Sequence, residues 1–295
     1  CPNCRFWTRV LAAMDDLGQR VVDFIAASPD KVRFAELVRH LNLPGGRAGV
    51  IHLKGIVADL VASGRLCYSC HYGSSFIERA YGRPCQISRH VVIKPPYTTW
   101  RPAPGQCLVE LERGAAFGGG EHATTRMAIE LIDDLLHHPA WRHKKRRLRG
   151  IDVGTGSGVL ALVAAALGVG RVHAIDSDPC AVFEARHNVC LNRLEERISV
   201  AAGGLEALDD AYDIVIANLR TPTLFKLRRL VRKTRGGQRA LVFSGLKTDE
   251  AAALCKWYRE DGYRTHQNRD EKGWSAICLI RNALPSDSAS CTQLH

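Results

Sequence analysis

From Leu148 onward, apolar stretches typical of β-strands alternate with stretches typical of α-helices. The strand patterns are LRGIDVG, RVHAIDS, RISVAAG, YDIVIANL, RALVFSG and a last WSAICLIR, and the helix patterns between them are VLALVAAALG, AVFEARHNVCLN, FKLRRLVRKT and DEAAALCKWYRE. Repeated strand–helix units form a mostly parallel sheet with helices on both faces. We therefore predict an α/β fold with a Rossmann-like, mostly parallel sheet for residues 89–283.

The chain is long enough for two domains. It has 295 residues, of which 46% are hydrophobic and 24% are charged, so it can bury a core. No apolar run reaches the length of a membrane span, and the first residues lack a signal-peptide pattern, so we expect a cytoplasmic protein without membrane contact. The chain starts at Cys1 rather than at Met, so a segment can precede it and export stays an open alternative. We expect the polar tail at residues 284–295 to be flexible.

Residues 1–88 carry a different pattern. Helical apolar spacing runs through residues 8–27, Phe34–Leu41 and about Val50–Val61, and the stretch RLCYSCHYGSSFIERAY then has the pattern of two short strands around Gly73. Three helices followed by a hairpin are the order of a winged helix-turn-helix. This order predicts a smaller, winged-helix-like domain ahead of the α/β domain.

The third helix of this first domain is poorly equipped to read a DNA groove. It is apolar over much of its circumference, and Lys54 and Arg65 are its only nearby cations. Base-edge recognition needs polar and charged side chains on the helix that enters the groove. The pattern favours a docking or dimerisation role, and so a homodimer, over DNA binding.

Among the eleven cysteines, two close pairs have the spacing of metal ligands. Cys1-Pro-Asn-Cys4 and Cys67-Tyr-Ser-Cys70 could together supply the four sulfurs of a tetrahedral zinc site. His71 follows the second pair, and C-x-x-C-H is also a haem attachment pattern, although nothing else here indicates electron transfer. Zinc is the favoured interpretation, with an iron–sulfur site, free thiols or disulfides as the alternatives. Most of the other cysteines are expected to be small core residues, for example Cys180, Cys190 and Cys278.

The formal net charge of the chain is +11, which favours an acidic or RNA-rich partner. The densest cationic cluster is RHKKRRLR, Arg142–Arg149, between a helix pattern and a strand pattern. We expect this segment to be a solvated connector, and it is the candidate contact for such a partner.

A glycine-rich turn follows the first strand of the α/β pattern. In IDVGTGSGVLAL, Asp152 precedes Gly154, Gly156 and Gly158, and a helix pattern follows. Glycines at the head of a strand allow the backbone to approach a bound ligand closely. The spacing is Gly-x-Gly-x-Gly and differs from the Gly-x-Gly-x-x-Gly of dinucleotide-binding turns. These residues are candidate nucleotide-binding residues.

Two further polar residues end strands of the same predicted sheet. Asp176 ends the second strand, where a carboxylate can accept both hydroxyls of a ribose. Asn218 ends the fourth strand, at the carboxyl edge where such sheets place their active sites. The three features together predict one nucleotide-binding site at that edge.

A second glycine-rich stretch, AFGGGEHATT at residues 116–125, precedes the helix pattern TTRMAIELIDDLL. Three consecutive glycines indicate a loop that comes very close to another group. Thr124 or Thr125 is a suitable residue type for the helix N-cap. Upstream, RHVVIKPP and QCLVELE have the pattern of strands.

The ordered set AFGGGEHATT, IDVGTGSGVLAL, AIDSDPCAV, IVIANL, VFSGL and the late Trp274 resembles the class I S-adenosylmethionine (SAM)-dependent methyltransferases. Among them it is most similar to the ribosomal protein L11 methyltransferase (PrmA) family, from about Trp100 to Ile280. The resemblance implies that Asp176 takes the ribose hydroxyls of SAM and Gly154 its methionine end. It also implies that Thr125 contacts SAM and that Asn218 lies beside the transferring methyl.

The resemblance further implies that the glycine loop folds over bound SAM, with Phe117 and His122 helping to close the site. The family loop usually has the sequence Phe-Gly-Thr-Gly-Thr-His-Pro-Thr-Thr, whereas Gly119, Glu121 and Ala123 depart from it here. The family also has a ferredoxin-like front domain, in contrast to residues 1–88. The resemblance therefore supports the family's cofactor for this chain more strongly than it supports the family's substrate.

Methyl transfer is a displacement in which an amine or hydroxyl must lose its proton before or during attack. Glu121 and His122 are candidate bases or orienting groups, and Asn218 could hold an amine through its carbonyl oxygen. The favoured prediction is a protein amine methyltransferase with a ribosomal-protein-like substrate. The alternatives are a small-molecule N- or O-methyltransferase that dimerises through the winged helix, and a nucleic-acid-associated regulator that binds SAM as a ligand.

Overall fold

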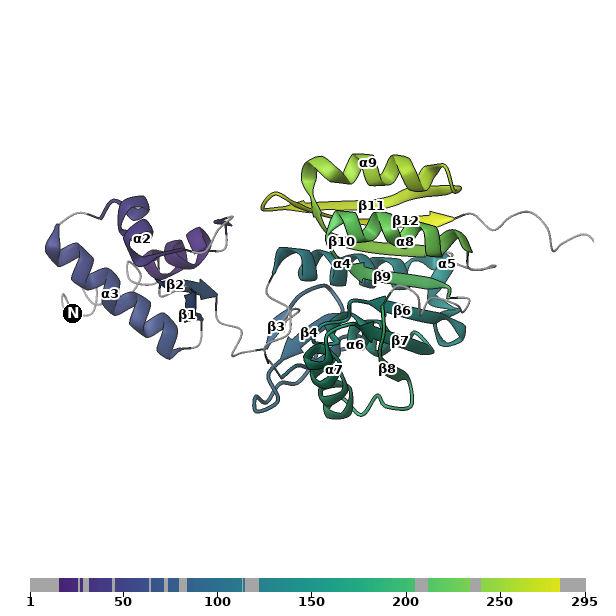
Figure 1. The fold of residues 1–295 in the computed structure, drawn as a ribbon. Coiled ribbons are helices and arrows are strands. Elements are labelled where there is room, and N and C mark those ends of the chain that lie inside the picture. The colour runs from purple at the N-terminus through teal and green to yellow at the C-terminus, as the bar shows by residue number, and fades with distance from the viewer. Residues whose placement is uncertain are drawn as a thin grey trace, which may run out of the picture. The chain divides into compact units, whose positions relative to one another are not determined.

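The fold was obtained as a computed structural model, which describes residues 16–25, 27–28, 32–43, 46–63, 65–71, 74–79, 84–112, 114, 122–204, 212–233 and 240–281 (Figure 1). The chain forms two compact units. One consists of Cys1–Cys85 with Lys94–Arg101, and the other of Gln86–Ile93 with Pro102–His295. Among the described helices, none combines the length and the apolar composition that crossing a bilayer requires.

The first unit has the predicted order of elements. Residues 16–25 are helical and are followed by α2 (Phe34–Leu41), α3 (Arg47–Ala62) and a hairpin of β1 (Leu66–His71) and β2 (Ser74–Arg79). Leucine, isoleucine and valine side chains from all of these elements form its core. Helix α3 starts earlier than predicted, because apolar spacing reveals only the part of a helix that faces the core. The winged-helix assignment and the domain boundaries stay predictions.

The predicted zinc ligands cannot be compared with the fold. Cys1 and Cys4 lie outside the described residues, and only the backbone of Cys67 and Cys70 is described, within β1. The zinc set therefore stays a prediction.

The second unit contains a seven-stranded sheet of order β11-β12-β10-β9-β6-β7-β8. Strands β6 to β10 are parallel where they pair, whereas β12 is antiparallel to both β10 and β11. This confirms the mostly parallel sheet. The strands are β6 (Arg149–Val153), β7 (Arg171–Asp176), β8 (Ile198–Ala202), β9 (Ile214–Asn218), β10 (Ala240–Lys247), β11 (Tyr263–Glu271) and β12 (Trp274–Arg281).

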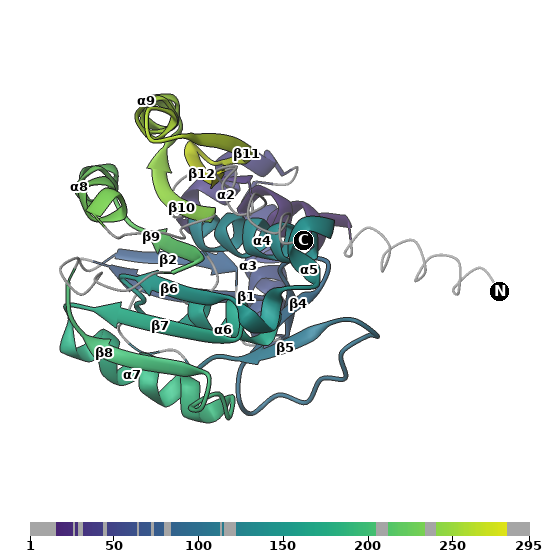
Figure 2. The ribbon, with the colours of Figure 1, turned by 90° about the vertical axis from the view of Figure 1, so that its right-hand side faces the viewer.

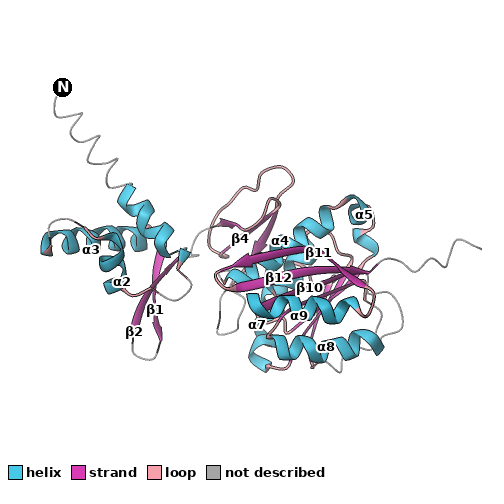
Figure 3. Ribbon diagram, turned by 90° about the horizontal axis from the view of Figure 1, so that it is seen from above, coloured by secondary structure: helices cyan, strands magenta, loops and turns pink. Residues whose placement is uncertain are grey.

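Strand β11 is absent from the sequence-based prediction. Its sequence, YRTHQNRDE, is almost wholly polar and only its first residue is buried. It forms the edge of the sheet, with β12 as its neighbour (Figure 3). The turn that joins the two strands, Lys272-Gly273, has φ values of 53° and 73°. Two central residues with positive φ form the hairpin turn that matches strand twist, so the register is set by the turn and not by apolar alternation.

Helices cover both faces of this sheet (Figure 2). On one face α4 packs against α6, β10 and β12, and on the other α8 packs against α9 and β10. A continuous apolar core lies between the strands and the α8–α9 layer. The helices of this unit are α4 (Ala123–His137), α5 (Pro139–Arg142), the 3-10 turn η1 (Lys145–Arg147), α6 (Val159–Ala166), α7 (Pro179–Leu191), α8 (Thr221–Lys233) and α9 (Thr248–Arg259).

A smaller sheet of order β3-β4-β5 is formed by β3 (Cys85–Gln86), β4 (Val91–Lys94) and β5 (Cys107–Glu110). It confirms both strands that were predicted upstream of the glycine loop and adds the short β3. The chain then runs from β5 toward residues 115–121, which lie outside the described residues.

The core assignment of the cysteines was partly wrong. Cys278 on β12 is fully buried, but Cys180 and Cys190 on α7 are exposed. Helix α7 buries a narrow face that includes Val182 and Val189, and both cysteines lie outside that face. The apolar residues beside Cys180 and Cys190 in the sequence therefore led to a wrong prediction that they are buried.

Candidate active site

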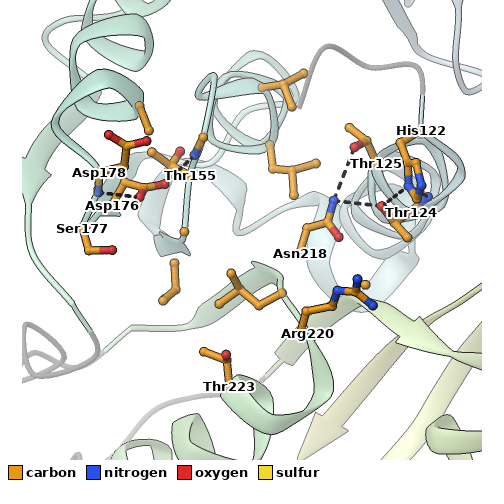
Figure 4. Close-up of a pocket in the computed structure, with 18 of the residues that line it drawn as sticks. His122, Thr124, Thr125, Thr155, Asp176, Ser177, Asp178, Asn218, Arg220 and Thr223 are labelled. Atoms are coloured by element: carbon orange, nitrogen blue, oxygen red, sulfur yellow. Dashed lines mark hydrogen bonds between the residues drawn. The ribbon is translucent and has the colours of Figure 1, made fainter. Parts of the chain in front are cut away.

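A cavity of about 600 Å³ opens at the carboxyl edge of β6, β7 and β9 (Figure 4). Its walls come from the glycine turn after β6, the ends of β7 and β9, and the start of α4. The lining residues are His122, Thr124, Thr125, Val153, Gly154, Thr155, Gly156, Val159, Leu160, Asp176, Ser177, Asp178, Ala181, Gly203, Gly204, Asn218, Leu219, Arg220, Thr223, Gly245 and Trp274.

The glycine turn requires glycine for a steric reason. The φ of Gly154 is +70°, in the left-handed region that side-chain-bearing residues rarely adopt. A Cβ atom on Gly154 would lie 2.5 Å from a methyl carbon of Leu219. The N–H groups of Gly154 and Thr155 both donate to the carbonyl of Ile175, at 2.9 and 3.0 Å, which fixes the turn against β7. The turn thus presents bare backbone to the cavity.

Asp152 lies beneath this turn and is not among the residues that line the cavity. Its Oδ2 accepts hydrogen bonds from the Thr155 hydroxyl at 2.6 Å and from the Ala161 N–H, in the first turn of α6, at 3.2 Å. Burial raises the pKa of Asp152 to about 6. In this geometry Asp152 holds the turn to the helix, and a direct contact between Asp152 and a cofactor stays a prediction.

Asp176 ends β7 with its carboxylate fixed from both sides. Its Oδ2 accepts the Gly156 N–H at 2.9 Å and its Oδ1 accepts the Asp178 N–H at 3.0 Å. A carboxylate oxygen can accept about two hydrogen bonds, so each oxygen keeps capacity for another donor. Asp176 therefore offers a rigid pair of acceptors to a molecule in the cavity, as a ribose diol requires.

Asn218 and the start of α4 form the other side of the cavity. The Asn218 amide donates to the hydroxyls of Thr124 and Thr125, and the hydroxyl of the buried Ser244 donates to the Thr124 carbonyl at 2.8 Å. Both amide hydrogens of Asn218 are thus used within the protein. Its carbonyl oxygen is the group left to orient a molecule in the cavity.

His122, and not a threonine, is the N-cap of α4, which corrects the prediction. Its Nδ1 accepts the N–H of Thr124 at 3.3 Å and lies 2.8 Å from the Thr124 hydroxyl. Partial burial, with Arg126 as the next contribution, lowers the pKa of His122 below its usual 6.5. The ring also meets Trp274 edge-on, with centroids 5.3 Å apart. Phe117 and Glu121, predicted at the same site, lie outside the described residues.

Two cations lie over the ring of Trp274, which lines the cavity, and neither was predicted from the sequence. The Lys247 ammonium lies 3.9 Å from the centroid of the Trp274 ring, and the Arg220 guanidinium lies 5.2 Å from it. Cations over an aromatic face are attracted by the ring quadrupole. This end of the cavity is therefore aromatic and positively charged.

Two asparagines one turn apart were also missed, Asn188 on α7 and Asn192 at the C-cap of that helix. Asn192 exchanges hydrogen bonds with the backbone of Glu110, at 2.6 and 2.8 Å, and Asn188 exchanges them with Glu112, at 2.9 and 3.1 Å. Asn188 additionally donates to the carbonyl of Ser157 in the glycine turn, at 3.0 Å. Asn188 thus joins the chain that leads into residues 115–121 to the glycine turn.

Outside the cavity, His90, Asp133 and His137 bring one possible ligand atom each within 4.8 Å of one another. The two ring Nδ1 atoms lie 2.9 and 2.7 Å from the same Asp133 oxygen, and the Lys145 ammonium lies 3.4 Å from the His137 Nε2. These are hydrogen-bond distances, and an ammonium group opposes the binding of a cation. The cluster is best described as a hydrogen-bond network.

The sequence profile of the ribosomal protein L11 methyltransferase (PrmA) family matches residues 78–282 of the chain. The chain belongs to the PrmA family. The matched region contains every residue that lines the cavity. The family assignment therefore includes the whole candidate site, while residues 1–77 lie outside the match.

Relatives in the PrmA family support the same assignment. A ribosomal protein L11 methyltransferase of Trichlorobacter lovleyi is 35% identical over 178 residues, which are 60% of this chain and 57% of the relative. One from Geobacter sulfurreducens is 35% identical over 198 residues, or 67% of this chain and 62% of the relative. The chain thus spans less than two thirds of the length of these relatives.

A solved PrmA-family structure shows the same fold. The ribosomal protein L11 methylase of Lactobacillus delbrueckii subsp. bulgaricus superposes with a TM-score of 0.58 at 27% identity, covering 68% of this chain and 98% of that one.

Proposed function

We propose that the cavity binds SAM and that the protein transfers its methyl group to an amine of a ribosomal protein. Membership of the PrmA family supports the reaction class. The observation that carries the proposal is the placement of Asp176 and Asn218 on opposite sides of one cavity, with the glycine turn beside Asp176 (Figure 4). That arrangement offers acceptors for a ribose at one end and an orienting amide at the other.

The described residues fit SAM in size and chemistry. A volume of about 600 Å³ is in the usual range for small-molecule sites. Asp176 would hold the ribose hydroxyls, the backbone of Gly154 would face the methionine end, and Thr125 would complete the wall at α4. When bound, SAM supplies an electrophilic methyl group on a sulfonium.

The residues near Asn218 would prepare the acceptor. The Asn218 carbonyl oxygen can accept a hydrogen bond from an amine and so orient its lone pair. His122 stays a candidate base or orienting group: burial lowers its pKa, which favours the neutral ring, but the Nδ1 of that ring already accepts the Thr124 N–H. Glu121 stays a second candidate base. Orientation and proton removal are the two contributions that this chain would make to the displacement.

We also propose the class of the methyl acceptor and the cellular location of the protein. The curated relatives are named for ribosomal protein L11, and we take that protein, in the cytoplasm, as the acceptor to test first. Residues 1–88 would dock the acceptor, since they lie almost wholly outside the family match. Binding of zinc by Cys1, Cys4, Cys67 and Cys70 and formation of a homodimer stay proposals.

The test is to incubate the protein with methyl-labelled SAM and either purified ribosomal protein L11 or a size-fractionated cell lysate. Label on L11 or on another discrete protein band supports a protein methyltransferase and identifies its target. Label in the low-mass fraction alone contradicts it and favours the small-molecule alternative. The Asp176→Ala variant, prepared in parallel, controls for labelling that does not depend on the cavity.

A further inference from the structure

The amino edge of the large sheet, opposite the cavity, is strongly cationic. Arg149 and Arg171 are the first residues of β6 and β7, they are paired in register, and both are exposed. Parallel strands place their first residues on one edge, so these two guanidinium groups come from neighbouring positions.

The basic connector continues this edge. Arg142, Lys144, Arg146 and Arg147 are exposed, and the backbone between them is held against the start of β7. The N–H of Gly170 donates to the carbonyls of Lys145 and Leu148, at 3.0 and 3.1 Å, and the Arg171 N–H donates to Leu148 at 3.3 Å. We call the set Arg142, Lys144, Arg146, Arg147, Arg149 and Arg171 the amino-edge surface.

The backbone of the connector is also in direct contact with the chain just before β7, so moving it away would break that contact. A Cβ atom on Gly170 would lie 2.1 Å from the carbonyl oxygen of Arg146, so the glycine permits a direct backbone contact. The connector cations are therefore presented by a fixed turn and not by a free loop.

Four cations of this surface, Lys144, Arg146, Arg147 and Arg171, lack the acidic partners that other arginines of the same unit have. Arg228 bonds to Asp261, and Arg269 bonds to Glu130, through ion pairs. Within the described part of the chain, no carboxylate lies within ion-pair distance of Lys144, Arg146 or Arg171, and the same holds for Arg147. Unpaired surface cations of one sign attract a polyanion.

We propose that the amino-edge surface binds the phosphate backbone of RNA. Guanidinium groups bind phosphate through two parallel hydrogen bonds, and release of counterions from the polyanion drives such binding without any apolar contact. A protein partner would need an apolar or aromatic centre. The exposed large hydrophobic side chains of the described residues belong to none of the segments that form this surface. The choice of RNA over DNA rests on the proposed ribosomal acceptor.

The surface leaves the cavity accessible. Strand β7 runs from Arg171 at the amino edge to Asp176 at the cavity, so the two sites are at opposite ends of the same strands. A strand of this length separates them by roughly 17 Å at about 3.3 Å per residue. An RNA-rich particle could therefore hold the enzyme while the cavity stays open to SAM and the acceptor.

The test measures RNA binding by fluorescence anisotropy over a series of salt concentrations, with a labelled RNA duplex and a DNA duplex of the same sequence. The variant is Arg146→Glu with Arg147→Glu. The matched control is Lys226→Glu with Arg229→Glu, since both residues are exposed on α8 and the change in charge is the same. Circular dichroism and thermal unfolding of each variant establish that it is folded.

We expect the wild type to bind RNA with an affinity that falls steeply with salt. The connector variant should bind at least about tenfold more weakly, with a slope of log K against log salt that is shallower by about 2, one for each lost phosphate contact. The control should stay close to wild type. No binding at low salt, equal losses in both variants, tighter binding of DNA, or displacement of RNA by polyglutamate as readily as by unlabelled RNA would overturn the proposal.

Calorimetry with SAM on the same preparations separates this proposal from the proposed function. RNA binding without SAM binding contradicts the methyltransferase proposal and leaves the surface as an RNA site. SAM binding without RNA binding overturns the surface alone. The connector variant should retain wild-type affinity for SAM, because its substitutions lie at the other end of the strands.

Discussion

The side-chain amide of Asn218 donates to the hydroxyls of both Thr124 and Thr125, over 3.2 and 3.3 Å. The end of β9 is thereby tied to the first turn of α4, and the amide is held in a single orientation. The carbonyl oxygen of Asn218 is the remaining group that can bond to an acceptor.

Replacing Asn218 with Ala should therefore slow methyl transfer more than it weakens SAM binding. We expect a fall of about 100-fold in the single-turnover rate with L11 as acceptor, because a small loss of alignment between reacting groups costs that much. Affinity for SAM should change by only a few fold, as measured by calorimetry. A large loss of SAM affinity with an unchanged rate would assign Asn218 to cofactor binding instead.

The pair Asn188 and Asn192 allows a matched test of the link between α7 and the glycine turn. Each Ala variant should lose about 1 to 2 kcal/mol of stability, because partly buried backbone groups of Glu110 or Glu112 lose their partners. Only Asn188→Ala should also weaken SAM binding, since only Asn188 reaches Ser157. Denaturant unfolding and SAM calorimetry measure the two effects. Equal losses of SAM affinity in both variants would show that Asn188 has a structural role only.

Substitution of Gly158 and of Gly105 by Ala distinguishes the stability cost of backbone strain from the cost of a packing clash. Their φ values are +85° and +83°, but a Cβ atom on Gly158 would lie 3.2 Å from the Cα of Ala185, whereas one on Gly105 meets nothing within 4 Å. Gly105→Ala should cost about 1 kcal/mol from strain. Gly158→Ala should cost about 1 to 3 kcal/mol more, because backbone of α7 must move. Denaturant unfolding would contradict the packing contribution if the two losses were equal.

His122 should make stability depend on pH. Its pKa is lowered in the folded protein, first by burial and then by Arg126. Between the usual pKa of 6.5 and the lower folded value, the unfolded chain binds more protons than the folded one. The free energy of unfolding should therefore fall as the pH drops through this window.

The His122→Asn variant isolates that contribution, because Asn is also a good N-cap and does not titrate. It should lose less stability than the wild type between pH 7 and about pH 5. Denaturant unfolding at the two pH values measures this. An identical loss in both proteins would show that other groups control the acid dependence.

Much of the site was predictable because its signals are local. A glycine turn after a strand, and polar residues at strand ends, are set by neighbours in the chain and by the common edge of a parallel sheet. Gly154, Asp176 and Asn218 could thus be placed together from the sequence, and the cavity brings all three into its wall.

The missed features depend on residues far apart in the chain. His122 looked like part of the glycine loop, but its ring caps α4 and contacts Trp274. Asn188 is an ordinary polar helix residue until the fold places it between Glu112 and Ser157. Strand β11 is polar because it is an edge strand, so it lacks the alternation that reveals the others.

The most direct test of the central claim is a calorimetric titration of SAM into the wild type and into Asp176→Ala. The control is Asp249→Ala, because Asp249 is an exposed acid on α9 that does not line the cavity. The account predicts saturable binding to the wild type and to the control. It predicts a loss of about 100-fold or more for Asp176→Ala, because two hydrogen bonds to a charged group are removed. Normal SAM affinity in Asp176→Ala, or no binding to the wild type, would contradict the assignment of the cavity as a SAM site.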